Sequence, residues 1–465
     1  LCAVTLYFLA YGTALRSKKL FIFFDALLLL MWHAIPGKFL DDVFSLLRFF
    51  ADGILIFYAA HAFAKAAFVA KCIARVSAYV LSGWRIAVIW LAILAYTLSY
   101  IHFFDYFRGQ TANEDFYAQG AYVSPPAVAV TGTGKRNLLI IYCESIEDTF
   151  GNKDVMGEDL LAPLRPFIDT PELRIDQMPG ADFTIGGIVA SQCGIPLKSI
   201  SILSGNLTGW ALDRYLPGAL CLGDYLKKDG YHNAYFNGSS GVFSGLDKFF
   251  KNHGYDEFMG KENWLEQGMV RDSDLNMWAL YDSDLADLCI ARIDQLMSQG
   301  KKFSLALSTM DTHEPGFLSP PCGKEGFEKN WYGYIRCSMG QVERILRHVR
   351  DRGWEDDFVI LVMGDHLARM PKIDAIDLKH ARGRYVLCSL SHDSGQMPNR
   401  REITHFDLFP SVLAALGFAI EGDRLGFGYN VFSKSVRPPS DYHELLRKNV
   451  LNHSDTYKKL WFPQN

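Results

Sequence analysis

NLLIIYC, at residues 137–143, is a continuous apolar run that is followed at once by the carboxylate of Glu144. A run without polar alternation is typical of a strand buried on both faces of a sheet. Similar β-rich runs follow it along the chain, at NAYF (233–236), FSLALS (303–308), FVILVM (358–363) and YVLCSL (385–390). Helices are expected between them, around residues 219–228, 275–298 and 333–352. This order predicts an α/β fold, a layered sandwich around a largely parallel central sheet.

The N-terminal part of the chain is apolar, whereas the rest is mixed in composition. Each of four stretches has about the length that a helix needs to cross a hydrocarbon core of roughly 30 Å. They lie at residues 1–15, 20–37, 49–70 and 86–104. One such stretch could be a buried helix of a soluble domain, but four in succession with charges mostly in the gaps favour a transmembrane helix bundle. We therefore predict a transmembrane domain at residues 1–105.

Basic residues in the short loops predict the orientation of these helices, because basic loops stay in the cytoplasm. The basic gaps are the first, with Arg16, Lys18 and Lys19, and the third, with Lys71, Arg75 and Arg85. Everything after residue 105 is then expected outside the cytoplasm. The same rule places Leu1 outside, and one more helix upstream of it would restore a cytoplasmic start. A longer reading frame with a further apolar span would support that hypothesis.

The outer part is expected to contain three segments. Residues 106–136 are polar and small, with Pro125, Pro126 and the run TGTGK, and predict a linker. A globular domain follows at residues 137–435, and a C-terminal tail at 436–465. The chain has 47 basic and 51 acidic residues and no basic stripe with interleaved aromatic residues. Nucleic acid is therefore not expected as a partner.

Seven of the nine cysteines lie in the outer part, where an oxidising compartment permits disulfides. Spacing alone does not assign the pairs. We hypothesise one disulfide between Cys193 and Cys221 and a second between Cys322 and Cys337, with Cys143 reduced inside its strand. The sequence has no CxxC pair, which disfavours a structural zinc ribbon.

Three predicted strands end in groups that can bind a metal ion. The groups are Glu144 after the first run, Asp311 and His313 after FSLALS, and Asp365 and His366 after FVILVM. Parallel strands end at one edge of a sheet, and ligands gather there. Carboxylate and imidazole groups could converge at that edge on one divalent cation. An Asp-His pair at a strand end can equally be turn chemistry, so the pair alone decides nothing.

Thr184 is a candidate nucleophile in the segment GADFTIGGIVASQCGIPL, where it precedes a small-residue run that predicts a helix start. A hydroxyl at a helix N-terminus meets oriented N–H groups that favour phosphate oxygens. Coordination by a cation would lower the pKa of the hydroxyl towards a usable alkoxide. The alternative is that Thr184 is only an N-cap, and spacing alone favours that alternative.

Six blocks of sequence occur between residues 137 and about 435. They are NLLIIYCESIEDTF, DFTIGGIVASQCGIPL, CLGDYLKKDGYHNAYFNGSS, STMDTHEP, VMGDHLA and ITHFDLFPSVLAALGF. In their order they resemble the bacterial phosphoglycerol transferases that decorate periplasmic glucans. More distantly they resemble lipoteichoic acid synthases and phosphoethanolamine transferases of the alkaline phosphatase and sulfatase superfamily. The resemblance implies a sulfatase-like catalytic domain on the periplasmic side of the bacterial inner membrane.

The resemblance also implies roles for individual residues. Those that would bind one divalent metal ion, Mn²⁺ or Zn²⁺, are Glu144, Thr184, Asp365 and His366. Thr184 would in addition be the nucleophile. His313 would contact the transferred group or assist the leaving oxygen. Asn237 and His405 match substrate-binding positions more loosely, and His405 is as readily structural.

The implied reaction transfers a phosphoglycerol head group from phosphatidylglycerol in the lipid bilayer to a glycan acceptor, through a covalent phosphothreonine. Sulfate ester hydrolysis is disfavoured, because CGIPL at residues 193–197 lacks the C-x-P-x-R pattern that sulfatases need. Two alternatives stay open. One is a phosphoethanolamine transferase acting on lipid A or a glycan, with the same chemistry and another donor. The resemblance to lipoteichoic acid synthases implies an Arg in the head-group pocket, which the corresponding loop YFNGSSGVF (235–243) lacks; its absence leaves the head group open but fits the glucan-modifying branch better. The other is an inactive envelope protein that binds glycans.

Overall fold

The computed structural model describes most of the outer part of the chain. The described residues are Leu91 and 115–465, apart from 169–172, 199–212, 279, 370–371, 374–375, 379–382, 392–396 and 464–465. Except for Leu91, the predicted transmembrane domain lies outside these residues. Among the residues that are described, no helix is both long enough and apolar enough to cross a membrane.

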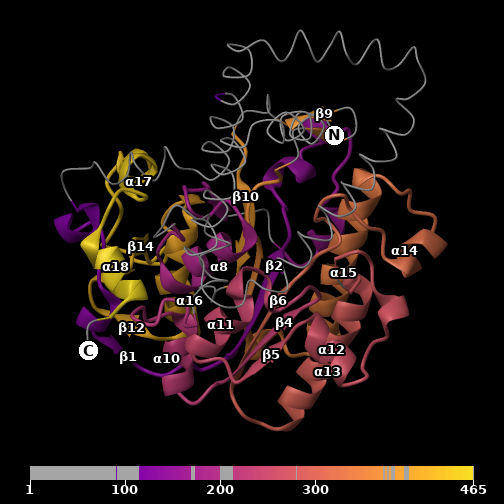
Figure 1. Cartoon of the computed structure of the whole chain (residues 1–465), viewed down its shortest axis with the longest axis horizontal. Coiled ribbons are helices and arrows are strands. Elements are labelled where there is room, and N and C mark those ends of the chain that lie inside the picture. Colours follow the sequence, from indigo (N-terminus) through magenta and orange to yellow (C-terminus); the bar gives the residue numbers. More distant parts are fainter. Residues whose placement is uncertain are drawn as a thin grey trace, which may run out of the picture. The chain divides into compact units, whose positions relative to one another are not determined.

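An eight-stranded sheet forms the centre of the domain (Figure 1). Its strands, in spatial order, are β11 (Glu402–Ile403), β3 (Leu173–Ile175), β10 (Val386–Leu390), β7 (Phe358–Gly364), β2 (Asn137–Cys143), β6 (Phe303–Ser308), β4 (His232–Asn237) and β5 (Glu257–Met259). All neighbours run parallel except β10, which is antiparallel to both β3 and β7. The predicted α/β fold with a largely parallel sheet is thus confirmed.

The run NLLIIYC forms the central strand β2 and is buried on both faces, as its continuous hydrophobicity predicts. Leu138, Ile140 and Tyr142 belong to the core on one side of the sheet. Leu139 and Ile141 alternate with them and belong to the core on the other side, because successive side chains of a strand point to opposite faces. Two separate hydrophobic cores therefore share one strand.

Helices cover each face of the sheet (Figure 1). One layer contains α8 (Thr184–Cys193), α10 (Leu222–Lys228), α11 (Leu246–Asn252) and α16 (Leu408–Leu416). The other contains α12 (Lys261–Glu266), α13 (Asp282–Ser298) and α15 (Trp331–Asp351). Helix α13 begins later than the predicted 275–298, because a 3-10 turn at Asp272–Asp274 and a bridge between Leu275 and Leu280 precede it.

Shorter elements complete the described part. The helices are α7 (Lys153–Met156), α14 (Pro320–Lys324), α17 (Tyr442–Asn449) and α18 (Asp455–Trp461). The short strands pair as β1 (Val130–Thr131) with β12 (Ala419–Ile420), β8 (Lys372–Ile373) with β9 (Ile376–Asp377), and β13 (Arg424–Leu425) with β14 (Gly428–Tyr429).

Residues that lead into the sheet and residues at the C-terminal end of the chain pack together. Strand β1 pairs antiparallel with β12. The Tyr117 hydroxyl donates a hydrogen bond to the backbone carbonyl of Val450 at 3.1 Å. The Tyr117 ring lies 4.7 Å from that of Phe427 and 5.6 Å from that of Tyr457, measured between centroids. The segments that precede and follow the central sheet thus share one apolar cluster.

Candidate active site

Glu144, Asp365 and His366 meet at the carboxyl edge of the central sheet. Strands β2 and β7 pair in parallel up to Cys143 opposite Gly364, so the residues that follow the two strands lie side by side. All three side chains are buried, with at most 3% of each residue exposed. One ligand atom of each lies within 4.8 Å of the others. These three residues form what we call the ligand cluster.

The two oxygens of the Asp365 carboxylate have different surroundings. Oδ1 accepts hydrogen bonds from the backbone N–H groups of Ser145 and His366, both at 2.8 Å. Ser145 can donate there because it adopts a left-handed conformation, with φ of 56°. Oδ2 is buried and has no hydrogen-bond partner among the described residues. Since buried polar atoms are nearly always satisfied, a lone buried carboxylate oxygen fits a site for a cation.

The imidazole of His366 is held so that one nitrogen faces both carboxylates. Its Nδ1 donates to the backbone carbonyl of Leu367 at 2.8 Å, which leaves the lone pair on Nε2. Nε2 lies 3.5 Å from Glu144 Oε1 and 3.6 Å from Asp365 Oδ2. A metal-binding histidine commonly donates its other N–H to a carbonyl in this way. The donor set, two carboxylates and one imidazole, therefore fits a divalent cation.

The buried charges of the ligand cluster act on one another. Burial, together with the nearby charge of Glu144, raises the pKa of Asp365 to about 7. Burial also raises the pKa of Glu144, but the imidazoles of His366 and His313 outweigh that effect and leave the pKa below its ordinary value. Two carboxylates that repel each other in a buried place are relieved by a positive charge between them. The electrostatics thus point to the same kind of ligand as the geometry.

Thr184 joins this group from helix α8, of which it is the first residue. Its Oγ1 donates a hydrogen bond to Glu144 Oε2 at 3.2 Å, and the side chain is only half-buried. No side chain caps the first turn of the helix at Phe183. The oriented N–H groups of a helix start favour negatively charged oxygens. A phosphate group placed here would meet the hydroxyl and the helix terminus together.

Two glycines let helix α8 pack closely against neighbouring backbone, and one of them, Gly187, faces the ligand cluster. A Cβ atom on Gly187 would lie 2.0 Å from the backbone oxygen of Asp365, and one on Gly186 would lie 2.7 Å from that of Gly180. Both neighbours are backbone atoms, which cannot rotate away. The small residues in TIGG therefore fix how near Thr184 comes to Asp365.

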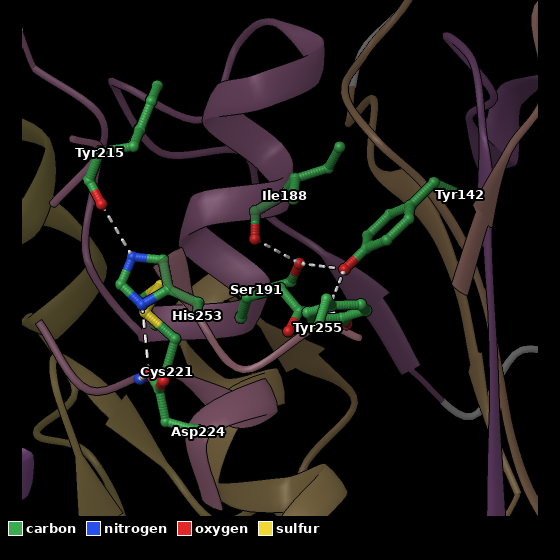
Figure 2. The surroundings of a disulfide bond; sticks show 10 residues. Tyr142, Ile188, Ser191, Tyr215, Cys221, Asp224, His253 and Tyr255 are labelled. Carbon is green, nitrogen blue, oxygen red and sulfur yellow. Dashed lines mark hydrogen bonds and ion pairs between the residues drawn. A yellow bond between two sulfur atoms is a disulfide. The ribbon is translucent and has the colours of Figure 1, made fainter. Parts of the chain in front are cut away.

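The opposite end of α8 is tied down by a disulfide and by buried hydrogen bonds (Figure 2). Cys193, the last residue of the helix, is bonded to Cys221, which caps α10. The hydroxyls of Tyr142 and Ser191 are 3.1 Å apart, which joins the helix to strand β2. Beside the disulfide, His253 bridges Asp224 and the carbonyl of Tyr215, with both contacts at 3.1 Å. The helix that carries Thr184 is thus anchored at its far end.

Cys221, Asp224 and His253 are also close enough to hold a metal ion, but the arrangement excludes this. The Cys221 sulfur is part of the disulfide, and both ring nitrogens of His253 already contact protein oxygens. The second disulfide, between Cys322 and Cys337, joins α14 to α15 and has no link to α8. The described cysteines without a disulfide partner are Cys143, Cys289 and Cys388, all buried.

Replacing Cys193 and Cys221 by alanine is expected to lower the free energy of unfolding by roughly 2–5 kcal/mol. Amide hydrogen exchange in α8 should accelerate, because the helix loses its anchor. The matched control is the double alanine variant of Cys322 and Cys337, which should be destabilised without faster exchange in α8. Denaturant titration and exchange mass spectrometry measure both effects. Equal protection of α8 in the two variants would show that the first disulfide does not hold this helix.

His313 lies beside the ligand cluster on the loop after β6. This loop is fixed to Glu144, since the hydroxyl of Thr312 donates to the Glu144 carbonyl at 2.6 Å and that of Thr309 accepts from its N–H at 3.0 Å. Nδ1 of His313 donates to the backbone carbonyl of Glu314 at 3.0 Å. The half-buried ring thus stands on a loop that is fixed to Glu144, and the hydrogen bond at Nδ1 leaves the lone pair on Nε2.

Trp278 contacts His313 and was not singled out by the sequence. Its ring is 5.2 Å from the imidazole between centroids, at an interplanar angle of 62°. Its Nε1 donates to the same carbonyl of Glu314 at 2.9 Å. The residue stands in a loop without periodic hydrophobicity, so nothing in the local pattern indicated this position.

Three further predicted residues, Asn237, His405 and Asp311, contribute no atom to the ligand cluster. The Asn237 amide donates to and accepts from Ser239, which shapes the turn after β4. His405 is fully buried, and its Nε2 donates to the backbone carbonyl of Asp365 at 3.0 Å; burial lowers its pKa to about 4. Asp311 accepts from the Ser319 hydroxyl at 2.5 Å, and burial with the neighbouring Asp282 raises its pKa well above the ordinary value. His405 thus supports Asp365 from behind as a neutral ring.

Comparisons with known proteins agree with this architecture. Residues 214–418 match the sulfatase family. Phosphoglycerol transferase I from Salmonella arizonae is 34% identical over 256 residues, and the same-named protein from Escherichia coli O6:K15:H31 is 34% identical over 257 residues. Each match covers 53% of this chain and 33% of the relative. The chain thus aligns with only a third of the length of these relatives.

Two solved structures share the fold. A protein in the alkaline phosphatase superfamily from Vibrio parahaemolyticus gives a TM-score of 0.50 at 20% identity, over 71% of this chain and 77% of that one. A lipoteichoic acid synthase from Listeria monocytogenes gives 0.52 at 16% identity, over 71% and 96%. The predicted resemblance is confirmed: residues 214–418 match the sulfatase family, and the described domain shares its α/β fold with these two structures.

Proposed function

We propose that the chain is a phosphotransferase of the bacterial envelope. It would move a phosphoglycerol group from phosphatidylglycerol in the membrane to a glycan acceptor outside the cytoplasm, by way of a covalent intermediate on Thr184. The observation that carries the proposal is the hydroxyl of Thr184, placed at an uncapped helix start and hydrogen-bonded to Glu144 within the ligand cluster. The similarity to proteins named phosphoglycerol transferase I supports the choice of group.

Glu144, Asp365, His366 and the Thr184 hydroxyl would hold one divalent cation. By ligand type they suit Mn²⁺ or Zn²⁺ about equally and Mg²⁺ less well. When bound, the cation would offset charge on the phosphate and favour the alkoxide form of the hydroxyl. The protein's own part is to fix the four groups in place, which the buried hydrogen bonds of Ser145, Leu367 and His405 do.

In the first step, Thr184 Oγ1 attacks phosphorus and its proton passes to Glu144 Oε2, its hydrogen-bond acceptor. The Oγ1–P bond forms as the bond to the diacylglycerol oxygen breaks, and that oxygen takes a proton from water, to which His313 returns one after the second step. In the second step, an acceptor hydroxyl gives its proton to His313 and attacks phosphorus. The P–Oγ1 bond breaks, and Oγ1 recovers its proton from Glu144. General acid-base transfer of this kind needs a group in hydrogen-bond reach of the reacting oxygen.

Incubation of the full chain in lipid nanodiscs with phosphatidylglycerol and Mn²⁺ is expected to add a phosphoglycerol mass to the peptide that contains Thr184. Thr184→Ala should show no adduct, while Thr184→Ser, which keeps a hydroxyl, should show one at a lower rate. Peptide mass spectrometry measures this. A parallel incubation with phosphatidylethanolamine tests the alternative donor, and an adduct only there would replace phosphoglycerol by phosphoethanolamine. An adduct from neither lipid would favour the inactive glycan-binding protein instead.

A further inference from the structure

We propose that Trp278 is a positioning residue for His313, holding the imidazole in the tautomer and orientation that proton transfer at Nε2 requires. The inference rests on the proton-carrying role of His313 in the proposed function. It goes beyond that function by assigning a task to an aromatic residue from a different loop. Trp278 itself would touch neither the phosphate nor the cation.

Three contacts connect Trp278 with the histidine. The indole Nε1 and the imidazole Nδ1 both donate to the backbone oxygen of Glu314, at 2.9 and 3.0 Å. The two rings also meet edge to face, with centroids 5.2 Å apart. A carbonyl oxygen has two lone pairs and can accept both hydrogen bonds. Trp278 therefore fixes the acceptor of the Nδ1 proton and, at the same time, one side of the ring.

Fixing the Nδ1 proton determines which nitrogen of His313 can exchange protons with substrate. In a neutral imidazole, the nitrogen that does not carry the proton is the acceptor, and the hydrogen bond at one nitrogen selects the tautomer. Without the indole, the Glu314 carbonyl and the imidazole would each be free to rotate on an exposed loop. The proton could then move to Nε2, and the ring would no longer present a base there.

The loop that carries Trp278 is itself anchored, so the indole has a defined place. Leu275 and Leu280 form an antiparallel bridge, and the Leu280 N–H donates to the Gly238 carbonyl at 3.2 Å. The Trp278 N–H donates to the Asn276 side chain at 2.9 Å. Trp278 remains 41% exposed, whereas its neighbour Met277 is 66% exposed. An exposed indole with these fixed contacts is better explained by a positioning task than by packing in the core.

Trp278→Phe keeps a ring but loses the N–H, and Trp278→Ala loses both contacts. We expect kcat of the transfer to fall about 10-fold in the first and about 100-fold in the second, since small misplacements of a reacting group cost about this much. KM for the acceptor should not change. Met277→Ala is the matched control from the same loop and should keep the parent kcat. Thermal unfolding of the full chain in nanodiscs checks that all variants remain folded.

A second measurement does not depend on turnover. In the full chain labelled with ¹⁵N-histidine, His313, assigned by comparison with His313→Gln, should show the Nδ1–H tautomer in the parent and a mixture in Trp278→Ala. A parent tautomer retained in Trp278→Ala overturns the proposal. So does a rise in acceptor KM at constant kcat, which would make Trp278 a sugar-binding surface. If the parent itself transfers nothing, the proposed function fails, and the tautomer measurement still decides the role of Trp278.

Discussion

Asp365→Asn is expected to weaken the binding of Mn²⁺ or Zn²⁺ to the full chain by more than about a hundredfold, since even the outer partners of metal ligands contribute about 10–100-fold. The substitution keeps the side-chain oxygen that accepts from Ser145 and His366. It replaces the unpartnered Oδ2 by an NH₂ group, which cannot bind a cation. Formation of the Thr184 adduct should fall by a similar factor.

Calorimetric titration of chelator-treated protein with Mn²⁺ and Zn²⁺ measures the affinity. Asp311→Asn is a sharp control, because Asp311 is another buried carboxyl at the end of a neighbouring strand but lies outside the ligand cluster. It should leave the metal affinity unchanged. The metal-free Asp365→Asn protein should be at least as stable as the metal-free parent, because one of two repelling buried carboxylates is gone. Unchanged affinity in Asp365→Asn would mean that the ligand cluster is not the metal site.

Gly187→Ala is expected to separate the nucleophile from the ligand cluster. The new methyl group would lie 2.0 Å from the backbone oxygen of Asp365, so helix α8 or the loop after β7 must shift. Overpacking of this kind costs roughly 1–3 kcal/mol, and a displacement of about 1 Å at Thr184 can lower the adduct rate about 100-fold. The expected loss of stability is opposite to the usual effect of this substitution, because alanine normally stabilises a helix interior relative to glycine by about 1 kcal/mol.

The matched control for Gly187 is Gly340→Ala in helix α15, where an added Cβ meets nothing within 4 Å. That variant should be slightly more stable than the parent, with the same adduct rate. Denaturant unfolding and adduct mass spectrometry distinguish the two glycines. If Gly187→Ala behaves like Gly340→Ala, the close approach of α8 to Asp365 does not govern the reaction.

The central sheet and its carboxyl edge could be predicted because both depend on local sequence. A strand that is buried on both faces has a continuous apolar sequence, as residues 137–143 and 358–363 do. Parallel strands end at the same edge of a sheet, where ligands gather. That reasoning was sufficient to place Glu144, Asp365 and His366 together. The reversed direction of β10 was not predicted, since YVLCSL has the same composition as the parallel strands.

The remaining parts of the site depend on tertiary contacts that leave no local pattern. Thr184 could be chosen as nucleophile only through the resemblance, because a threonine at a helix start is more often a cap. Trp278 meets His313 through a carbonyl from another loop, which no periodicity encodes. For Asn237 and His405, the sequence showed polar groups near the site but not that Ser239 and the Asp365 backbone already engage them.

The apolar cluster shared by Tyr117, Phe427 and Tyr457 bears on how the domain can be cut out of the chain. The segment around Tyr117 and the C-terminal helices α17 and α18 pack into this cluster from two ends of the sequence. A fragment trimmed to residues 137–435 would uncover both sides and leave Phe427 facing solvent, with exposed apolar surface prone to aggregation. A fragment of residues 115–463 would keep both segments packed on the cluster. The fragment of residues 137–435 is therefore the less soluble of the two.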